Sequence, residues 1–347
     1  MKVAIITDSH CGANNNSEFM IEYQTRFYNE VFFPYLRQHQ INHIIHLGDY
    51  YDNRKALNVR AISENRKIFL DKLREYEMDM DILVGNHDVY YKNTNKVNSL
   101  QELMGSYSNI SIIEDPVTTN IMGRDICLIP WINDENRDDA LKIIKSSNAE
   151  ICLGHFEFSG FKMNKNDPYG FRGTEQISKK TFKKFKKVLS GHFHTKSKQG
   201  NIEYLGSPFE FTWADLDDPK YFHILDLETL EIEAIRNPLT IYSEIIYRDA
   251  IDVKDIDVDR KIIRIIPEEI NNEKAYEKFF SYVKEHAYSV TTKLPAKEEN
   301  AGMEIETVDV MDTPALITQY IENLETDFDK VKLGQLMVDI YKEAQNI

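Results

Sequence analysis

The chain has few cysteines, and their spacing excludes a disulfide framework. Three occur among 347 residues, Cys11, Cys127 and Cys152, and they form neither a C-x-x-C pair nor a zinc-finger spacing. We expect Cys127 and Cys152 to be buried neutral thiols, since an unpaired cysteine packs as a small apolar residue.

Long apolar runs are also missing, although apolar residues make up 42% of the chain and are numerous enough for a sizeable core. No stretch approaches the length of a membrane-spanning helix. The first ten residues reach Asp8 and His10 before any long apolar region or small-residue cleavage site, so they do not resemble a secretory signal. These absences predict a cytoplasmic protein without a membrane anchor.

An excess of basic residues is lacking too. The net charge is -15, and residues 241–347 alone hold 23 acidic against 13 basic side chains. Such acidity argues against tight nonspecific binding of nucleic acid by this chain alone, because that binding depends on lysine and arginine neutralising phosphates. If the substrate is DNA, a partner would have to supply much of the basic surface.

The first 240 residues alternate short apolar runs with amphipathic stretches, which is typical of a layered α/β fold. Residues 18–39 and 60–76 are predicted helices, with Pro34 expected to kink or break the first. The predicted strands span residues 3–7, 43–47, 81–84, 126–130, 151–153, 188–190 and 203–205.

The pattern changes near residue 240, where we place the end of a domain spanning 1–240. Residues 241–293 have the pattern strand, helix, strand (260–266, 272–285 and 288–293), which predicts a small α/β capping domain. Residues 294–312 are acidic and poor in large apolar side chains, as in a linker. Residues 313–347 hold two short amphipathic helix candidates, a helix pair that begins with the N-cap and first-turn pair Thr313-Pro314.

Five short polar segments follow predicted strands. They are Asp8-Ser9-His10, Gly48-Asp49-Tyr50-Tyr51-Asp52, Gly85-Asn86-His87-Asp88, Gly154-His155 and Gly191-His192-Phe193-His194. Strand ends are where α/β folds place their sites, and imidazole and carboxylate groups suit first-row divalent metals. A single pair of this kind occurs often by chance, and His155 alone would be read as a core or loop histidine. The ordered set is much more specific, and the glycines permit the tight turns that such a site needs.

This ordered set resembles the calcineurin-like metallophosphoesterases. Two further segments, residues 204–208 (Tyr-Leu-Gly-Ser-Pro) and 129–131 (Ile-Pro-Trp), are similar to the SbcD-type nucleases of double-strand-break repair, and the chain length is similar to that of their compact phage members. The resemblance is close over residues 1–225 and only architectural over 240–347. It implies a layered β-sandwich flanked by helices, with the small α/β cap and the helix pair attached.

The resemblance also implies two divalent metal ions. Asp8, His10, Asp49 and His194 would hold one ion, and Asp49 would bridge to a second ion held by Asn86, His155 and His192. Manganese is the family's usual metal, and magnesium, iron or zinc also suit the ligands. Such an ion pair activates a water molecule and clamps both oxygens of an in-line displacement at phosphorus.

By the same resemblance His87 acts on the phosphate or protonates the leaving oxygen, and the Asp52 carboxylate accepts a hydrogen bond from His87 and sets its tautomer. Many SbcD-type nucleases carry a histidine where this chain has Asp52, whereas the phosphatase branch carries aspartate. Arg54 and Lys55 are predicted phosphate contacts because they adjoin the site. Residues 179–187 hold six lysines, which would either contact DNA or form a solvated helix face with Phe182 and Phe185 turned inward.

The leading hypothesis is therefore a metal-dependent DNA nuclease subunit, an exonuclease on duplex ends and an endonuclease on single strands. The resemblance implies a coiled-coil ATPase partner of the SbcC type, bound through the C-terminal helices, and a homodimer formed through residues 56–76 and 96–105. It is compatible with a phage-encoded protein acting in the host cytoplasm. The alternatives are a metallophosphatase or small-molecule phosphodiesterase with the same site, and a non-catalytic scaffold.

Overall fold

The computed structural model describes residues 1–293, except 168, 174, 175, 250, 252, 254, 255 and 269, together with six tail positions (321, 330, 332, 333, 336 and 337). The chain divides into two units, Met1–Pro295 and Ala296–Ile347. The six tail positions are helical, but the predicted linker and almost all of the predicted helix pair lie outside the described residues. Among the residues that are described, no helix has the length and apolar character needed to cross a lipid bilayer.

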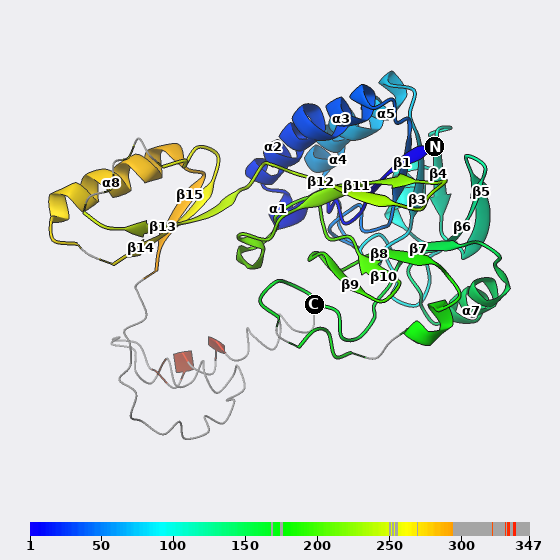
Figure 1. Cartoon of the computed structure of the whole chain (residues 1–347). Coiled ribbons are helices and arrows are strands. Elements are labelled where there is room, and N and C mark those ends of the chain that lie inside the picture. The colour runs from blue at the N-terminus through cyan, green and yellow to red at the C-terminus, as the bar shows by residue number, and fades with distance from the viewer. Residues whose placement is uncertain are drawn as a thin grey trace. The chain divides into compact units, whose positions relative to one another are not determined.

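The first unit is built on two six-stranded sheets (Figure 1). The first sheet has the order β12-β11-β1-β2-β3-β4; strands β1 to β4 run parallel, and β11 and β12 add antiparallel strands at one edge. Its strands are β1 (Lys2–Ile6), β2 (His43–His46), β3 (Asp79–Leu83), β4 (Ile110–Ile113), β11 (Tyr221–Asp226) and β12 (Ile232–Arg236).

The second sheet has the order β5-β6-β7-β8-β10-β9, with four parallel strands between two antiparallel edge strands. Its strands are β5 (Val117–Ile121), β6 (Arg124–Ile129), β7 (Ile151–His155), β8 (Lys187–Gly191), β9 (Ser197–Gln199) and β10 (Ile202–Tyr204).

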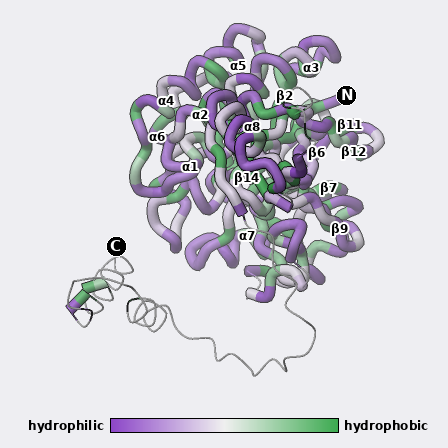
Figure 2. The backbone as a smooth tube through the Cα atoms, turned by 90° about the vertical axis from the view of Figure 1, so that its left-hand side faces the viewer, coloured by the Kyte–Doolittle hydropathy of each residue, from purple (hydrophilic) through white to green (hydrophobic). Residues whose placement is uncertain are grey.

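Helices cover the outer faces of the two sheets (Figure 1). The first sheet carries α2 (Glu18–Arg26), α3 (Phe33–Gln38), α4 (Val59–Asn65) and α5 (Asp71–Glu75), and the second carries α7 (Arg137–Ser146). The short helices α1 (Ala13–Asn16) and α6 (Ser99–Met104), and 3-10 turns at Lys179–Phe182 and Trp213–Asp215, lie in connecting segments. In Figure 2 the apolar segments gather in the interior of this unit, beneath a mostly hydrophilic periphery.

The predicted helix over residues 18–39 is found as one helical stretch. Its hydrogen bonding changes from α to π over Phe27–Phe32, and the N–H of Phe33 bonds to the carbonyl of Tyr28. Pro34 then occupies the first turn of α3, a position that does not need its missing N–H. The second predicted helix likewise contains a π segment, Arg66–Leu70, between α4 and α5.

Strand side chains alternate between two cores, as the pleat of a strand requires. In β1, Val3 and Ile5 point into the core between the sheets, whereas Ala4 and Ile6 point toward the helices. In β6, Ile126 and Leu128 face the first sheet, and Cys127 and Ile129 face α7. The result is a four-layer α/β/β/α sandwich, which confirms the predicted fold class. Cys127 and Cys152 are fully buried, as expected.

A third sheet of three parallel strands, β13-β14-β15, follows the sandwich in sequence. It comprises β13 (Tyr242–Tyr247), β14 (Ile262–Pro267) and β15 (Ser289–Thr292), and α8 (Glu273–His286) connects the last two. Asn272 caps α8 by accepting a hydrogen bond from the N–H of Ala275. A separate small core that includes Tyr247, Ile263 and Phe279 holds these elements together, so the predicted strand-helix-strand pattern is present.

Candidate metal centre

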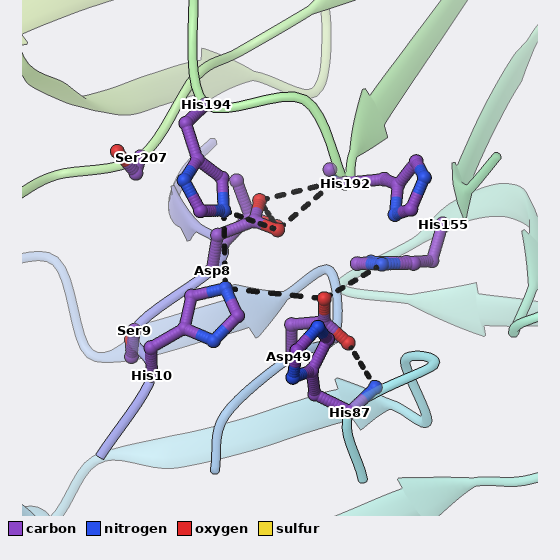
Figure 3. A network of polar contacts seen from close by, with 12 residues as sticks. Asp8, Ser9, His10, Asp49, His87, His155, His192, His194 and Ser207 are labelled. Carbon is purple, nitrogen blue, oxygen red and sulfur yellow. Dashed lines mark hydrogen bonds and ion pairs between the residues drawn. The ribbon is translucent and has the colours of Figure 1, made fainter. Parts of the chain in front are cut away.

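The five polar segments meet at one edge of the sandwich, where parallel strands of both sheets end (Figure 3). Asp8 and His10 follow β1, Asp49 follows β2 and Asn86 follows β3, all in the first sheet. From the second sheet, His155 ends β7, and His192 and His194 follow β8. Residues separated by almost two hundred positions therefore face one another across the gap between the sheets.

The backbone at this edge is strained. Asp8, His10, Asp49 and His192 all have positive φ angles, of 51°, 43°, 53° and 90°. Non-glycine residues rarely adopt this conformation, which persists only where the surroundings enforce it and which concentrates at functional sites. Four of the residues that point into the cluster thus carry a backbone cost that packing elsewhere must offset.

Three glycines permit the close approach of these loops. A Cβ at Gly85 would lie 2.2 Å from the Asp49 nitrogen, and one at Gly191 would lie 2.0 Å from the Thr7 hydroxyl. Gly48 has a φ of +102°, and a Cβ there would lie 2.7 Å from Nδ1 of His155. The expected role of these glycines in close backbone approach is confirmed.

Four side-chain atoms around His155 point lone pairs at a common position. Nδ1 of His155 lies 2.8 Å from the Leu47 carbonyl and donates its proton there. Its Nε2 then faces Oδ1 of Asn86 at 3.0 Å and Oδ2 of Asp49 at 3.3 Å, and Nδ1 of His192 faces the same Asn86 oxygen at 2.9 Å. Acceptors gathered in this way repel one another unless a proton or a cation lies between them. Two nitrogens and two oxygens are a donor set suited to a first-row divalent ion.

A second group of ligand atoms lies beside the first. Nε2 of His10 is 3.1 Å from Nε2 of His194 and 3.9 Å from Oδ2 of Asp49, and Nε2 of His194 is 4.0 Å from Oδ1 of Asp8. The triads Asp8, His10, His194 and Asp49, His155, His192 each have ligand atoms within 4.8 Å of one another. Asp49 contacts members of both groups, so all seven predicted ligands are brought together.

The electrostatics of the cluster reflect this crowding. Burial alone would lower the pKa of His155, but the Asp49 carboxylate raises it to about 9. Burial would conversely raise the pKa of Asp49, but His155 and His10 hold it well below its ordinary value. Burial and the neighbouring His10 keep the pKa of His194 well below its usual range. A proton thus sits between Asp49 and His155 where a cation would fit.

His87 and Asp52 need a correction. Nδ1 of His87 lies 2.6 Å from the main-chain carbonyl of Asp52, which is therefore the group that orients this imidazole. The Asp52 carboxylate, expected to do so, instead lies 3.3 Å from Nδ1 of His10. The reason is geometric: the loop after Asp49 turns its backbone toward His87 and its side chain toward β1. The main-chain N–H of His87 donates to Oδ1 of Asp49 at 2.7 Å, which anchors the residue beside the cluster.

Several supporting residues did not stand out in the sequence. His46 accepts a hydrogen bond from the N–H of Gly48 at 3.2 Å, so its other nitrogen donates to the Ser9 hydroxyl at 2.8 Å. Burial lowers the pKa of His46 to about 3, and this imidazole stays neutral. The Asp88 carboxylate accepts from the N–H groups of Tyr50, Tyr51 and Gly85. These contacts tie the first three loops together. The sequence held one usable signal, the polar His46 inside an apolar strand.

The wall on the side of the second sheet was also missed. Glu157 lies 3.3 Å from Nε2 of His192. The ring of Trp131 lies 5.3 Å from that of His192, and the Phe211 ring lies 5.2 Å from those of both His10 and His194. Trp131 belongs to the Ile-Pro-Trp segment used for the family resemblance, so that segment has a structural role at the site.

The basic side chains are placed less decisively. Arg54 is half-buried and Lys55 exposed in the loop after Asp52. In the segment 179–187, Phe182 and Phe185 are buried, as expected. Lys184 donates to the carbonyls of Lys145 and Ser147, and Lys186 pairs with Glu150, so part of this basic run is engaged within the protein.

A four-layer sandwich with a histidine, aspartate and asparagine cluster at its strand ends defines a class, the metal-dependent phosphoesterases. The chain belongs to the calcineurin-like phosphoesterase family, whose model matches residues 1–196. Enzymes of this family use divalent metals, and the prediction that the chain is a phosphodiester hydrolase is confirmed.

Two relatives narrow the position of the chain within the family. It is 32% identical to exonuclease subunit 1 of Enterobacteria phage T4, over 99% of each chain. It is 22% identical to the SbcD component of nuclease SbcCD from Staphylococcus epidermidis, over 67% of each chain. A solved structure of a dimetal phosphatase from Danio rerio is similar at 10% identity and a TM-score of 0.43, covering 69% of this chain and 97% of that one. The expected resemblance to SbcD-type nucleases is thus confirmed.

Proposed function

We propose that this chain is the nuclease subunit of a DNA-processing complex and hydrolyses phosphodiester bonds with two divalent metal ions, manganese in the first place, with magnesium as the alternative. It would act as an exonuclease on duplex ends and as an endonuclease on single strands, in recombination and double-strand-break repair. The observation that carries the proposal is the convergence of seven donor side chains on Asp49. The full-length likeness to a phage exonuclease subunit supports DNA as the substrate.

The donor groups support a division of ligands between two positions. Asp8, His10, Asp49 and His194 would hold one ion, and Asp49, Asn86, His155 and His192 the other. When bound, the ions would supply Lewis acidity and lower the pKa of a coordinated water. The protein would orient the ligands through the strained strand ends and keep bulk water away with Trp131 and Phe211.

His87 would be the group that acts on the substrate. Because its Nδ1 donates to the Asp52 carbonyl, Nε2 is the atom able to give a proton to the leaving oxygen or to neutralise a phosphoryl oxygen. Asp52 would support this step through its main-chain carbonyl. Arg54 and Lys55 would contact the DNA backbone next to the site.

The wider assembly is part of the same proposal. The second relative is named as one component of a nuclease, SbcCD, whose name also includes SbcC, and this supports an SbcC-type coiled-coil ATPase partner bound by residues 313–347. A homodimer through residues 56–76 and 96–105 is supported by apolar side chains exposed on both segments, Val59 at 81% and Val97 at 45%. A phage relative supports action in the host cytoplasm.

The first prediction separates this function from its alternatives. With manganese, the purified chain should degrade linear duplex DNA and circular single-stranded DNA far more efficiently than a chromogenic phosphodiester. His87→Ala should lower the turnover number for DNA by about 10²- to 10⁴-fold, the usual contribution of a general acid, while calorimetry still detects two bound metal ions. His286→Gln, a change on the exposed end of α8, is the matched control and should behave as wild type.

Two outcomes would redirect the assignment. Hydrolysis of the chromogenic ester with intact DNA would identify a phosphatase or small-molecule phosphodiesterase. DNA binding without cleavage of either substrate would favour a scaffold. Unchanged cleavage by His87→Ala would require a different acid.

A further inference from the structure

Two carboxylates stand just outside the ligand cluster, and each faces the outward nitrogen of a different ligand histidine. Asp52 lies beside His10, and Glu157 lies beside His192. The histidines belong to the two different ligand groups described above. Resting on the proposed function, we infer that Asp52 and Glu157 are positioning residues, one for each metal position.

The Asp52 contact is the less expected of the two. His10 is almost fully buried, and its Nδ1 forms no complete hydrogen bond among the described residues. The Asp52 carboxylate oxygen, 3.3 Å away, is its ion-pair partner. The opposite nitrogen of the ring, Nε2, points toward Asp49 and His194. A proton held on Nδ1 by the carboxylate leaves the Nε2 lone pair directed at the first metal position.

Glu157 has the same relation to His192. Its carboxylate lies 3.3 Å from Nε2, and Nδ1 on the other side of the ring faces the Asn86 oxygen at 2.9 Å. The acceptor fixes the tautomer and makes the ligand nitrogen more basic. His155, in the same group, is held by the neutral Leu47 carbonyl instead, so each position has one histidine backed by a charge.

Exposure makes the hypothesis practical to test. The side chains of Asp52 and Glu157 are 36% and 26% exposed, so their replacement by the isosteric amides should not disturb the core. A shell of this kind usually changes metal affinity about 10- to 100-fold when it is removed.

The experiment is calorimetric titration of manganese into the metal-free full-length chain. His192→Ala leaves the first position for study, and His10→Ala leaves the second. In the His192→Ala background, Asp52→Asn should weaken manganese binding about 10- to 100-fold, whereas Glu157→Gln should have little effect. In the His10→Ala background the two effects should be reversed. Glu228→Gln, a 73% exposed carboxylate next to the opposite end of β1, is the control and should leave both affinities unchanged.

Each outcome decides a separate question. A wild-type chain that binds no manganese would refute the proposed function itself. A wild-type chain that binds two ions, with Asp52→Asn and Glu157→Gln binding equally tightly, would refute the positioning roles alone. Equal weakening of both positions by either variant would show a general loss of negative charge and would also overturn the assignment. The melting temperatures of the metal-free variants check that each one folds.

Discussion

At the scale of single residues, the motif side chains could be recognised because their chemistry is unusual at strand ends. Imidazole and carboxylate groups there suit a metal, and the structure brings all of them together. The role of Asp52 could not be predicted correctly, because it depends on which way one loop turns its carbonyl and its carboxylate. His46 and Asp88 were missed for a similar reason, since their partners are main-chain groups that no residue pattern encodes.

A buried histidine outside the site makes stability depend on pH. His223 in β11 is buried, its Nε2 has no hydrogen-bond partner among the described residues, and burial lowers its pKa to about 3. The unfolded chain, with a histidine pKa near 6.5, therefore binds more protons than the folded chain between about pH 6.5 and pH 3. The free energy of unfolding is unaffected by this group above pH 6.5 and falls as the pH drops through that window.

Replacing this histidine should remove that part of the acid sensitivity. Going from pH 7.5 to 5.5, wild type should lose about 1.4 kcal/mol more stability than His223→Gln, measured by urea unfolding in chelator. His39→Gln, at an exposed position, should retain the wild-type dependence. Identical pH dependence in wild type and His223→Gln would contradict the assignment.

At the scale of elements, apolar periodicity was sufficient to locate the parallel strands and the long helices. The strands missed were mostly edge strands or antiparallel additions, such as β5, β9 and β12. Their sequences are short and polar, because an edge strand with one solvated side needs little apolar character. Their place in a sheet depends on pairing with strands that lie elsewhere in the chain.

The turn after β3 offers a test at this scale. Gly85→Ala should push the Asp49 main chain and carboxylate away, because the new Cβ would lie 2.2 Å from one and 2.3 Å from the other. We expect a loss of about 1–3 kcal/mol in stability together with much weaker manganese binding, measured by denaturation and calorimetry. Gly200→Ala is the control: its surroundings are open and its φ is +59°, so it should cost only about 1 kcal/mol and leave metal binding intact. Normal metal affinity in Gly85→Ala would show that the loop can relax around the added methyl group.

At the scale of the whole molecule, the site joins the two sheets of the sandwich. Asp8, His10, Asp49 and Asn86 come from the first sheet, and His155, His192 and His194 from the second. An ion bound between them would connect layers that otherwise meet through the apolar core of Val3, Ile45, Leu128 and their neighbours. Metal should therefore stabilise the protein globally as well as activate it.

Metal removal measures this coupling. At a manganese concentration about 100 times the dissociation constant, each occupied position should raise the free energy of unfolding by about 2.7 kcal/mol relative to protein in chelator. Thermal denaturation should show the rise, and His192→Ala should retain only part of it. A melting temperature that does not respond to manganese would argue against a metal-binding native state.

The sequence by itself determined the chemical class of this protein and most of its sandwich. Side-chain chemistry and apolar periodicity are local properties, and the order of the five motifs could be read directly from them. Only the tertiary structure decided which nitrogen of each histidine faces the cluster, which carboxylate supports which imidazole and how the edge strands pair. Those features arise from contacts between loops far apart in sequence, where a single turn of the backbone exchanges one partner for another.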